Sequence, residues 1–252
     1  MTRIFTDHTE RWITGIALLV LVGFIGWMDN FFVMWAFLGV IYMFAFYEAM
    51  KLFKLVGPAA YFWASLLWIF AYFYPNPDDL FYLIAIIFAS SLAYFHNFDK
   101  RLILPFLYPV SGIFFFLILY DDFGIQAMFW LLVTVALTDV GAFFTGKAIG
   151  KTKFSDTSPN KTLEGVIGGI VIATIFGTYV GLYIAPLWIA LVVTLFTAVS
   201  SIFGDLFESY LKREAGVKDS GDILPGHGGI LDRIDGYLFG APMMILALRA
   251  FL

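Results

Sequence analysis

The feature that most constrains this chain is a succession of long apolar stretches that fills nearly all of it. Nine can be marked, at about 12–28, 31–50, 59–74, 78–96, 103–120, 125–146, 163–184, 187–208 and 234–252. A helix that crosses a bilayer needs about 20 apolar residues, and fewer suffice when flanking residues reach the interface. Barrel strands would instead give alternating segments of ~10 residues. The pattern predicts an all-α, polytopic membrane helical bundle with about nine transmembrane helices.

The composition requires lipid around such a bundle. Hydrophobic residues make up 61% of the chain and charged residues 13%, whereas soluble domains are about 45–50% apolar and about 25% charged. So much apolar surface cannot be buried in one water-soluble core, so the bilayer must solvate much of it. The net charge of −4 argues against a nucleic-acid partner. Because the chain has no cysteine, disulfides, thiolate metal sites and a cysteine nucleophile are excluded.

The basic residues predict an orientation. If the N-terminus is cytoplasmic, 14 of the 15 Lys and Arg residues fall in cytoplasmic segments, and only Arg249 falls outside. The turns then expected outside, at 29–30, 74–79, 121–124 and 181–186, contain no Lys or Arg. This is the positive-inside bias of membrane proteins. It supports both the cytoplasmic N-terminus and the number of spans, because adding or deleting one span would disrupt the alternation.

Two acidic residues lie within apolar stretches. Asp139 is in the sixth stretch and Asp205 in the eighth, where a carboxylate costs about 2.5–3.5 kcal/mol on insertion scales. Such acids are functional candidates, although an acid at the membrane edge can also pair with a nearby lysine. Helical spacing gives one face of the eighth helix a polar stripe, with Glu208 beside it, made of Ser201, Asp205, Ser209 and Lys212. The stripe predicts water, a metal or a charged ligand next to it.

The hydrophilic loop at residues 147–162 carries four lysines with hydroxyl groups and glycines. Such a loop suits a polyanion such as a triphosphate. Residues 158–160 are typical of a turn, and Asn160 or Thr162 could cap the next helix, whose N-terminus beside lysines would attract anions. The alternative is an ordinary positive-inside loop followed by a capped helix.

The most specific part of the sequence is residues 209–235, here named the signature segment. It predicts a helix end, a hydrophilic loop and a glycine-rich turn that enters the last apolar stretch. Glycines 226, 228 and 229 would let backbone N–H groups approach a ligand closely. Asp232 and Asp235 are three residues apart and can face one way on a helix. Together with Asp205 they could bracket a Mg²⁺ ion.

The signature segment resembles that of the phosphatidate cytidylyltransferases, also called CDP-diacylglycerol synthases. The family pattern places Ser, Lys-Arg, Lys-Asp, Gly, Pro-x-His-Gly-Gly and Asp-Arg-x-Asp at fixed spacing, and every fixed position is met here. The likeness covers roughly residues 134–240. It implies transfer of a cytidylyl group from CTP to phosphatidate, which gives CDP-diacylglycerol and pyrophosphate for phospholipid biosynthesis. It also implies a multi-pass cell-membrane enzyme with its active site facing the cytoplasm, a requirement for Mg²⁺ alone or with a second cation, and a homodimer.

The resemblance also implies roles for individual residues. The metal would be held by Asp205, Asp232 and Asp139. The catalytic residues would be Asp205, Asp232, Lys212 and Asp235. The substrate-binding residues would be Ser158, Asn160, Lys161, Thr162, Ser201, Ser209, Arg213, Lys218, Asp219, Gly226, His227, Gly228, Gly229 and Arg233. Residues 1–124 would then form N-terminal membrane helices with about five spans, and residues 125–252 a catalytic part with about four spans and cytoplasmic motif loops.

Other functions stay open at this point. An ion-coupled transporter would explain Asp139 and Asp205 but not the glycine-rich loop with its Lys, His and Arg residues. A related enzyme could transfer a cytidylyl or phosphoryl group to another membrane lipid, such as a polyprenol or an archaeal ether lipid. A CDP-alcohol phosphotransferase also uses membrane aspartates, but the Asp-Gly-x-x-Ala-Arg core of that family is absent from the sequence.

Single introduced cysteines test the expected orientation, because the natural chain has none. We expect a membrane-impermeant thiol reagent to label Asp78→Cys in intact cells and to label Asp156→Cys only after permeabilisation, since the two loops lie on opposite sides in the nine-span arrangement. Labelling of both positions from the same side would contradict that arrangement.

Overall fold

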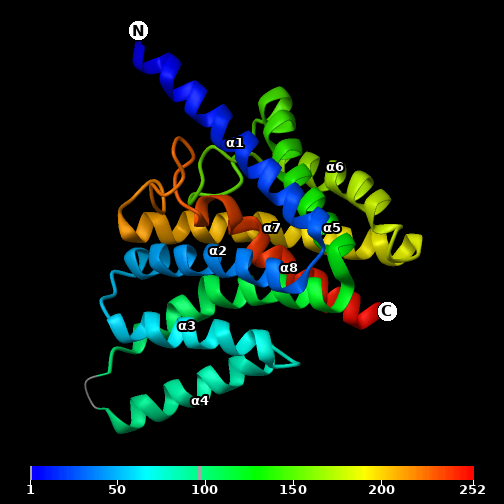
Figure 1. Ribbon diagram of the computed structural model, residues 1–252. Coiled ribbons are helices and arrows are strands. Elements are labelled where there is room, and N and C mark those ends of the chain that lie inside the picture. Colours follow the sequence, from blue (N-terminus) through cyan, green and yellow to red (C-terminus); the bar gives the residue numbers. More distant parts are fainter. Residues whose placement is uncertain (1, 96–97) are drawn as a thin grey trace. The chain divides into compact units, whose positions relative to one another are not determined.

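The computed structural model describes residues 2–95 and 98–252, with side chains from residue 13 onward. These residues form eight α-helices: α1 (Thr2–Met28), α2 (Phe31–Leu52), α3 (Pro58–Phe73), α4 (Asp79–Tyr94), α5 (Ser111–Ile149), α6 (Leu163–Gly181), α7 (Leu187–Ala215) and α8 (Leu231–Phe251) (Figure 1). Two short helical segments, η1 (Lys100–Ile103) and η2 (Phe106–Val110), precede α5. Within the described ranges there is no β-strand. The predicted all-α class is therefore confirmed.

Several of these helices have the length and apolar character of membrane spans. Among the described residues, five helical segments qualify: Phe31–Leu52, Lys100–Ile149, Leu163–Gly181, Leu187–Ala215 and Leu231–Phe251. Three shorter apolar helices, at Ile13–Met28, Pro58–Phe73 and Asp79–Tyr94, coincide with the first, third and fourth predicted stretches. Large apolar side chains such as Phe143, Ile175 and Phe176 are exposed, as expected where lipid is the solvent. These features indicate a multi-pass membrane protein.

A single glycine separates two predicted stretches within α5. At Gly124, φ is 75° and ψ is −174°, outside the helical region. This combination is open essentially only to glycine, because any side chain would collide with the backbone. The outer turn expected at 121–124 therefore takes the form of a break inside α5 and not of a separate loop.

The chain divides into two compact units. The first comprises Met1–Ile118 and Val217–Arg233, and the second comprises Leu119–Gly216 and Ile234–Leu252. Most of the signature segment therefore packs with the N-terminal helices, although it follows α7 in the sequence. The division at residue 124 was predicted from the positions of the apolar stretches alone and describes spans, not compact units.

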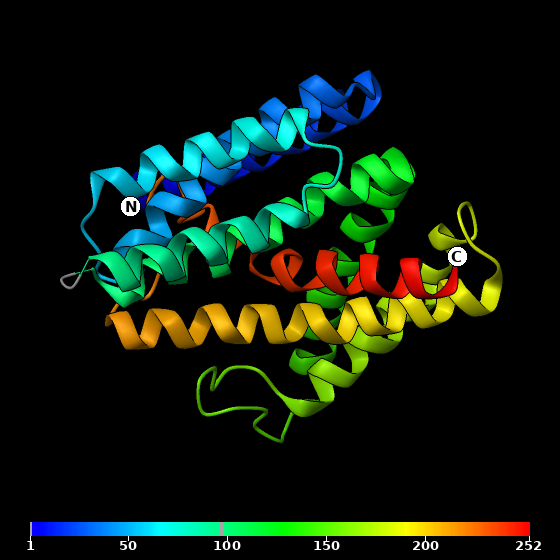
Figure 2. The same cartoon turned by 90° about the horizontal axis from the view of Figure 1, so that it is seen from below.

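An aromatic cluster forms the core of the first unit. Tyr42 and Phe46 of α2 and Trp68 of α3 are buried. The Tyr42 hydroxyl donates to the carbonyl oxygen of Ala64 at 3.0 Å. The Trp68 ring lies 4.8 Å from the Tyr42 ring and 5.4 Å from that of Phe114, measured between centroids. This packing holds α2 and α3 side by side, as both views show (Figures 1 and 2).

Helices of the second unit approach one another closely at glycines. α7 and the part of α8 in this unit run alongside in opposite directions (Figure 2), and a Cβ atom at Gly204 would lie 2.5 Å from the carbonyl oxygen of Asp235. Likewise, a Cβ atom at Gly169 of α6 would overlap the carbonyl oxygen of Thr138 in α5. The absence of side chains at these positions lets polar residues of neighbouring helices come together.

Gly169→Ala should destabilise the protein, because the new methyl group would have to displace the backbone at Thr138. Overpacking typically costs about 1–3 kcal/mol, so we expect a lower midpoint of thermal unfolding, followed in detergent by the fluorescence of the seven Trp residues. Gly23→Ala is the matched control: no described atom lies within 4 Å of a Cβ there, and alanine favours a helix over glycine by about 1 kcal/mol. Equal midpoints for Gly169→Ala and the wild type would contradict this packing.

Candidate active site

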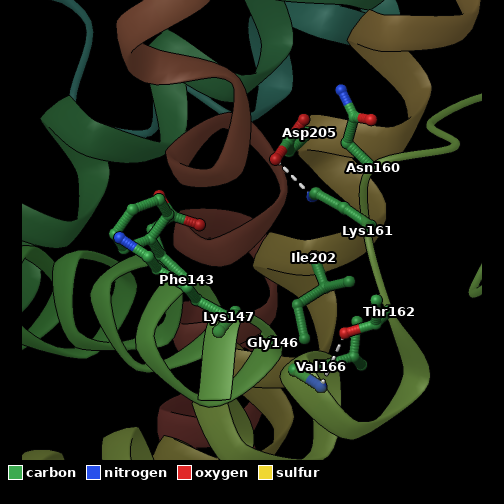
Figure 3. A pocket seen from close by; sticks show the side chains of 12 residues that line it. Phe143, Gly146, Lys147, Asn160, Lys161, Thr162, Val166, Ile202 and Asp205 are labelled. Atoms are coloured by element: carbon green, nitrogen blue, oxygen red, sulfur yellow. Dashed lines mark hydrogen bonds and ion pairs between the residues drawn. The ribbon is translucent and has the colours of Figure 1, made fainter. Parts of the chain in front are cut away.

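A cavity of about 400 Å³ opens in the second unit beside α5, α6 and α7 (Figure 3). Its polar lining consists of Asp139, Lys147, Asn160, Lys161, Thr162 and Asp205. The apolar side chains of Phe143, Val166 and Ile202 line other parts of it. Small-molecule sites are commonly ~300–1,000 Å³ and combine apolar walls with a few polar groups. This cavity has both properties.

An ion pair between Lys161 and Asp205 marks the polar part of the cavity. The lysine belongs to the loop before α6 and the aspartate to α7, and their side chains point toward each other in Figure 3. They are 24% and 27% exposed, so the pair is neither sealed off nor freely hydrated. An anionic ligand entering here would meet an ammonium group that is already positioned by a carboxylate.

Two further carboxylates lie near Asp205. Asp139 of α5 and Asp235 of α8 interact electrostatically with Asp205, and Asp235 also interacts with Asp139. Lys161 offsets the charge near Asp139, and Lys212 offsets the charge near Asp235. Like charges in a low-dielectric setting repel strongly unless cations compensate them. Acids from three helices therefore create a region that favours bound cations.

The acids of this region fit one mode of Mg²⁺ binding. In the described part of the chain, no three Asp, Glu or His side chains converge into a group that could hold a metal ion on its own. Mg²⁺, however, is usually held by one or two carboxylates and completes its shell with water and substrate phosphates. The carboxylates of Asp139 and Asp205, which both line the cavity, provide oxygen ligands of this kind.

The polar stripe predicted on α7 is present as two pairs of neighbouring side chains. The Ser209 hydroxyl donates to Oδ1 of Asp205 at 3.4 Å. One turn further, Nζ of Lys212 donates to Oε2 of Glu208 at 2.7 Å. Glu208 is fully buried, so the Lys212 ammonium compensates a buried acid in addition to its electrostatic interaction with Asp235. Ser201 is also buried, and its hydroxyl donates within α7 to the carbonyl oxygen of Ala198 at 2.9 Å.

Residues 150–162, here named the lysine loop, are folded by hydrogen bonds to the start of α6. Oγ1 of Thr162 accepts from the Gly165 N–H at 3.2 Å, so Thr162 is the N-cap. The Glu164 carboxylate accepts from the N–H of Lys151 at 3.0 Å and of Thr152 at 3.1 Å, and from the Thr152 hydroxyl at 2.8 Å. Lys161 immediately precedes this N-cap, so its backbone is held next to the start of α6.

In the first unit, the signature segment closes around Asp232. Oδ2 of Asp232 accepts from the Ser220 N–H at 2.9 Å, from the Ser220 hydroxyl at 2.9 Å and from the Gly229 N–H at 2.8 Å. A carboxylate oxygen with three donors is strongly fixed in position. The N–H of Gly229, which was expected to approach a ligand, donates to this acidic side chain.

The glycine-rich turn is held by Arg233. Its Nε and Nη2 donate to the carbonyl oxygen of His227 at 2.9 and 2.5 Å. Gly226 and Gly228 flank the histidine with φ values of 72° and 84°, a region that favours glycine. Turn geometry therefore explains these two glycines without a ligand.

The predicted site residues fall into two groups. The second unit contains Asp139, Ser158, Asn160, Lys161, Thr162, Ser201, Asp205, Ser209, Lys212, Arg213 and Asp235, and the first contains Lys218, Asp219, Gly226, His227, Gly228, Gly229, Asp232 and Arg233. Glu48 and Ser220, both buried in the first unit, were not among the predicted site residues. Glu48 lies within an apolar stretch, as Asp139 does, so the same sequence pattern could have identified it.

Glu164→Ala should loosen the lysine loop, because the three backbone and hydroxyl donors of Lys151 and Thr152 would lose their acceptor. We expect trypsin to cleave at residues 151–161 several-fold faster than in the wild type, as measured by mass spectrometry of the fragments. Asp156→Ala is the matched control, since that acid is 99% exposed and pairs only with Lys153 among the contacts described for this loop. Equal cleavage of both variants would contradict an anchoring role for Glu164.

Known proteins resemble this chain over most of its length. The model of the cytidylyltransferase family matches residues 9–251. Phosphatidate cytidylyltransferases of Helicobacter pylori strains J99 and 26695 are 48% and 47% identical over 235 residues, which is 92% of this chain and 88% of each relative. The phosphatidate cytidylyltransferase of Bacillus subtilis strain 168 is 48% identical over 135 residues, 52% of this chain and 50% of that relative. The chain belongs to the cytidylyltransferase family.

Proposed function

We propose that this protein transfers the cytidylyl group of CTP to phosphatidate, giving CDP-diacylglycerol and pyrophosphate for phospholipid biosynthesis. Two relatives that bear the name phosphatidate cytidylyltransferase align with nearly the whole chain. The structural observation that carries the proposal is the Lys161–Asp205 pair in a cavity that combines charged and polar groups with apolar walls. A phosphate group attached to acyl chains needs both a positive charge and an apolar surface.

The reaction brings two anions together. An oxygen of the phosphatidate phosphate attacks the α-phosphorus of CTP, the bond from that phosphorus to the β-phosphate bridging oxygen breaks, and pyrophosphate leaves in line. No covalent nucleophile from the protein is needed, because the barrier lies in charge repulsion and alignment. Lys161 and Lys212 supply positive charge beside the acids of the second unit. Arg213 and Lys218 are exposed, at the end of α7 and just after it, and would bind phosphates from solution.

We propose Asp205, Asp139 and Asp232 as Mg²⁺ ligands, with Asp235 as a further acid and room for a second cation. Mg²⁺ bound there would neutralise charge on the attacking and leaving oxygens. The remaining site residues would position substrate: the lysine loop through Ser158, Asn160, Lys161 and Thr162, and the signature segment through Ser209, Asp219, His227 and Arg233. Ser201 would contribute by its place on α7.

The membrane arrangement is part of the same proposal. Nine spans with a cytoplasmic N-terminus would place the lysine loop and the loop of the signature segment on the cytoplasmic side, as the charge distribution predicts. CTP reaches the enzyme from the cytoplasm and phosphatidate from the leaflet, so the site would open to both. The homodimer is proposed from the family resemblance.

Asp205→Asn should lower the rate of pyrophosphate release by about 10²-fold or more, because it removes charge at the centre of the polar region. Purified protein is incubated with labelled CTP, Mg²⁺ and phosphatidate, and both CDP-diacylglycerol and pyrophosphate are measured. Asp156→Asn, which alters an exposed acid of the lysine loop, should retain wild-type activity. Near-normal activity of a folded Asp205→Asn protein would remove Asp205 from the site.

The same assay separates the alternative functions. Wild-type protein is offered phosphatidate, a polyprenyl phosphate and an archaeal ether-lipid phosphate in parallel. Product formed only with phosphatidate supports the proposal, whereas product formed only with another lipid identifies a related transferase. Ion flux in reconstituted vesicles without lipid-dependent pyrophosphate release would indicate a transporter.

A further inference from the structure

Glu48 of α2 is a fully buried acid that the proposed mechanism does not use. It lies in the first unit, outside the motifs on which the sequence resemblance rests. Its Oε1 accepts from the Ile230 N–H at 3.0 Å, and its Oε2 accepts from the Leu231 N–H at 2.8 Å. A third donor, the Ser220 hydroxyl, lies 3.0 Å from Oε2. All three donors belong to the signature segment.

The two backbone donors lie at the start of α8, whose first residue is Leu231. N–H groups at a helix start have no partner within the helix and favour negative charge. Capping side chains usually come from the residue just before the helix. Here the cap comes from a residue more than 180 positions earlier in the chain. Glu48 therefore fixes the start of α8, the helix that carries Asp232 in its first turn.

Two glycines of the signature segment pack directly against this carboxylate. A Cβ atom at Gly229 would lie 2.6 Å from Oε2 of Glu48, and one at Gly221 would overlap Oε1. Both positions therefore have a steric reason to be glycine that involves Glu48 and no substrate. Part of the signature is thus shaped to receive an acid from α2.

Ser220 connects Glu48 to Asp232. Its hydroxyl lies 3.0 Å from Oε2 of Glu48 and 2.9 Å from Oδ2 of Asp232. A hydroxyl group has one proton and two lone pairs, so it donates to one of these carboxylates at a time. The Ser220 N–H and the Gly229 N–H also donate to Oδ2 of Asp232. The three donors to Asp232 therefore come from Ser220 and Gly229, which both pack against Glu48.

We propose that Glu48 is a positioning residue for cytidylyl transfer, which acts through Ser220 and the start of α8 to set the orientation of the Asp232 carboxylate. This rests on the proposed function, in which Asp232 is a Mg²⁺ ligand. It gives α2, a helix predicted only to be a membrane span, a direct part in building the active site.

Glu48→Gln and Ser220→Ala test this separately. The glutamine replaces one acceptor oxygen with an NH₂ group that would face the backbone donors, whereas Ser220→Ala leaves the bonds from Ile230 and Leu231 to Glu48 intact. We expect each variant to raise the Mg²⁺ concentration for half-maximal activity at least fivefold. CTP with Mg²⁺ should raise the thermal unfolding midpoint, and the Mg²⁺ concentration needed for this shift should increase by the same factor in each variant. This measurement reports binding and needs no turnover.

The double variant distinguishes a shared route from independent effects. If Glu48 acts through Ser220, Glu48→Gln with Ser220→Ala should shift the Mg²⁺ dependence no more than the larger single change, because coupled residues are not additive. Glu214→Gln, at an exposed glutamate near the end of α7, is the control and should match the wild type.

Different results would contradict the role of Glu48 and the proposed function. Unchanged Mg²⁺ dependence in Ser220→Ala would overturn the role of Glu48. A lower unfolding midpoint in Glu48→Gln with unchanged Mg²⁺ dependence would also overturn it, because Glu48 would then be only structural. Should Glu48→Gln fail to give a monodisperse protein, Ser220→Ala alone decides. Wild-type protein without phosphatidate-dependent activity would instead refute the proposed function, and the shift in unfolding midpoint with Mg²⁺ and CTP would still test the role of Glu48.

Discussion

Inside a membrane protein, a carboxylate must find its compensating charge or hydrogen-bond donors within the protein, because hydrocarbon supplies neither. The structure meets this requirement in two different ways. In the second unit, the ammonium groups of Lys161 and Lys212 compensate acids on α7 and nearby helices. In the first unit, Glu48 is compensated by backbone N–H groups and a serine hydroxyl. In each unit, at least one of these pairings joins residues that are distant in the sequence.

The two kinds of compensation, by lysine ammonium groups and by backbone N–H groups, suit different roles. An ammonium on a flexible side chain can leave its carboxylate and bind a phosphate, so the Lys161–Asp205 pair suits a place where substrates come and go. Backbone donors cannot move away without unfolding the start of a helix, so Glu48 suits a permanent structural role. Glycines allow close packing near both arrangements: a Cβ atom at Gly204 would meet the backbone of Asp235, and one at Gly229 would meet Ser220 and Glu48.

Much of the architecture was predictable because membrane helices follow local rules. Most apolar stretches coincide with single helices, although those at 103–120 and 125–146 share α5. The Thr162 cap was one of two candidates, and helical spacing predicted that Ser209 would lie beside Asp205. α7 continues to Ala215, beyond the apolar stretch that ends at 208, in agreement with the polar stripe that placed Ser209 and Lys212 on this helix.

What the sequence did not show depends on contacts between distant residues. Glu48 and Leu231 are brought together only by the fold, and no local spacing links them. For the same reason, glycines 221 and 229 could not be recognised as partners of an acid, and the grouping of residues 217–233 with the N-terminal helices was not foreseen.

The way the lysine loop is attached has a practical consequence. The two ends of the loop are joined by two backbone hydrogen bonds. The Leu163 N–H donates to the carbonyl oxygen of Thr152 at 2.8 Å, and the Phe154 N–H donates to that of Lys161 at 2.9 Å. Residues 155–157 at the tip of the loop take no part in these two hydrogen bonds. Lys161 lies close to the start of α6 and is positioned there. A fluorophore or an epitope inserted at the tip would therefore report on this loop while leaving the Lys161 ammonium beside Asp205.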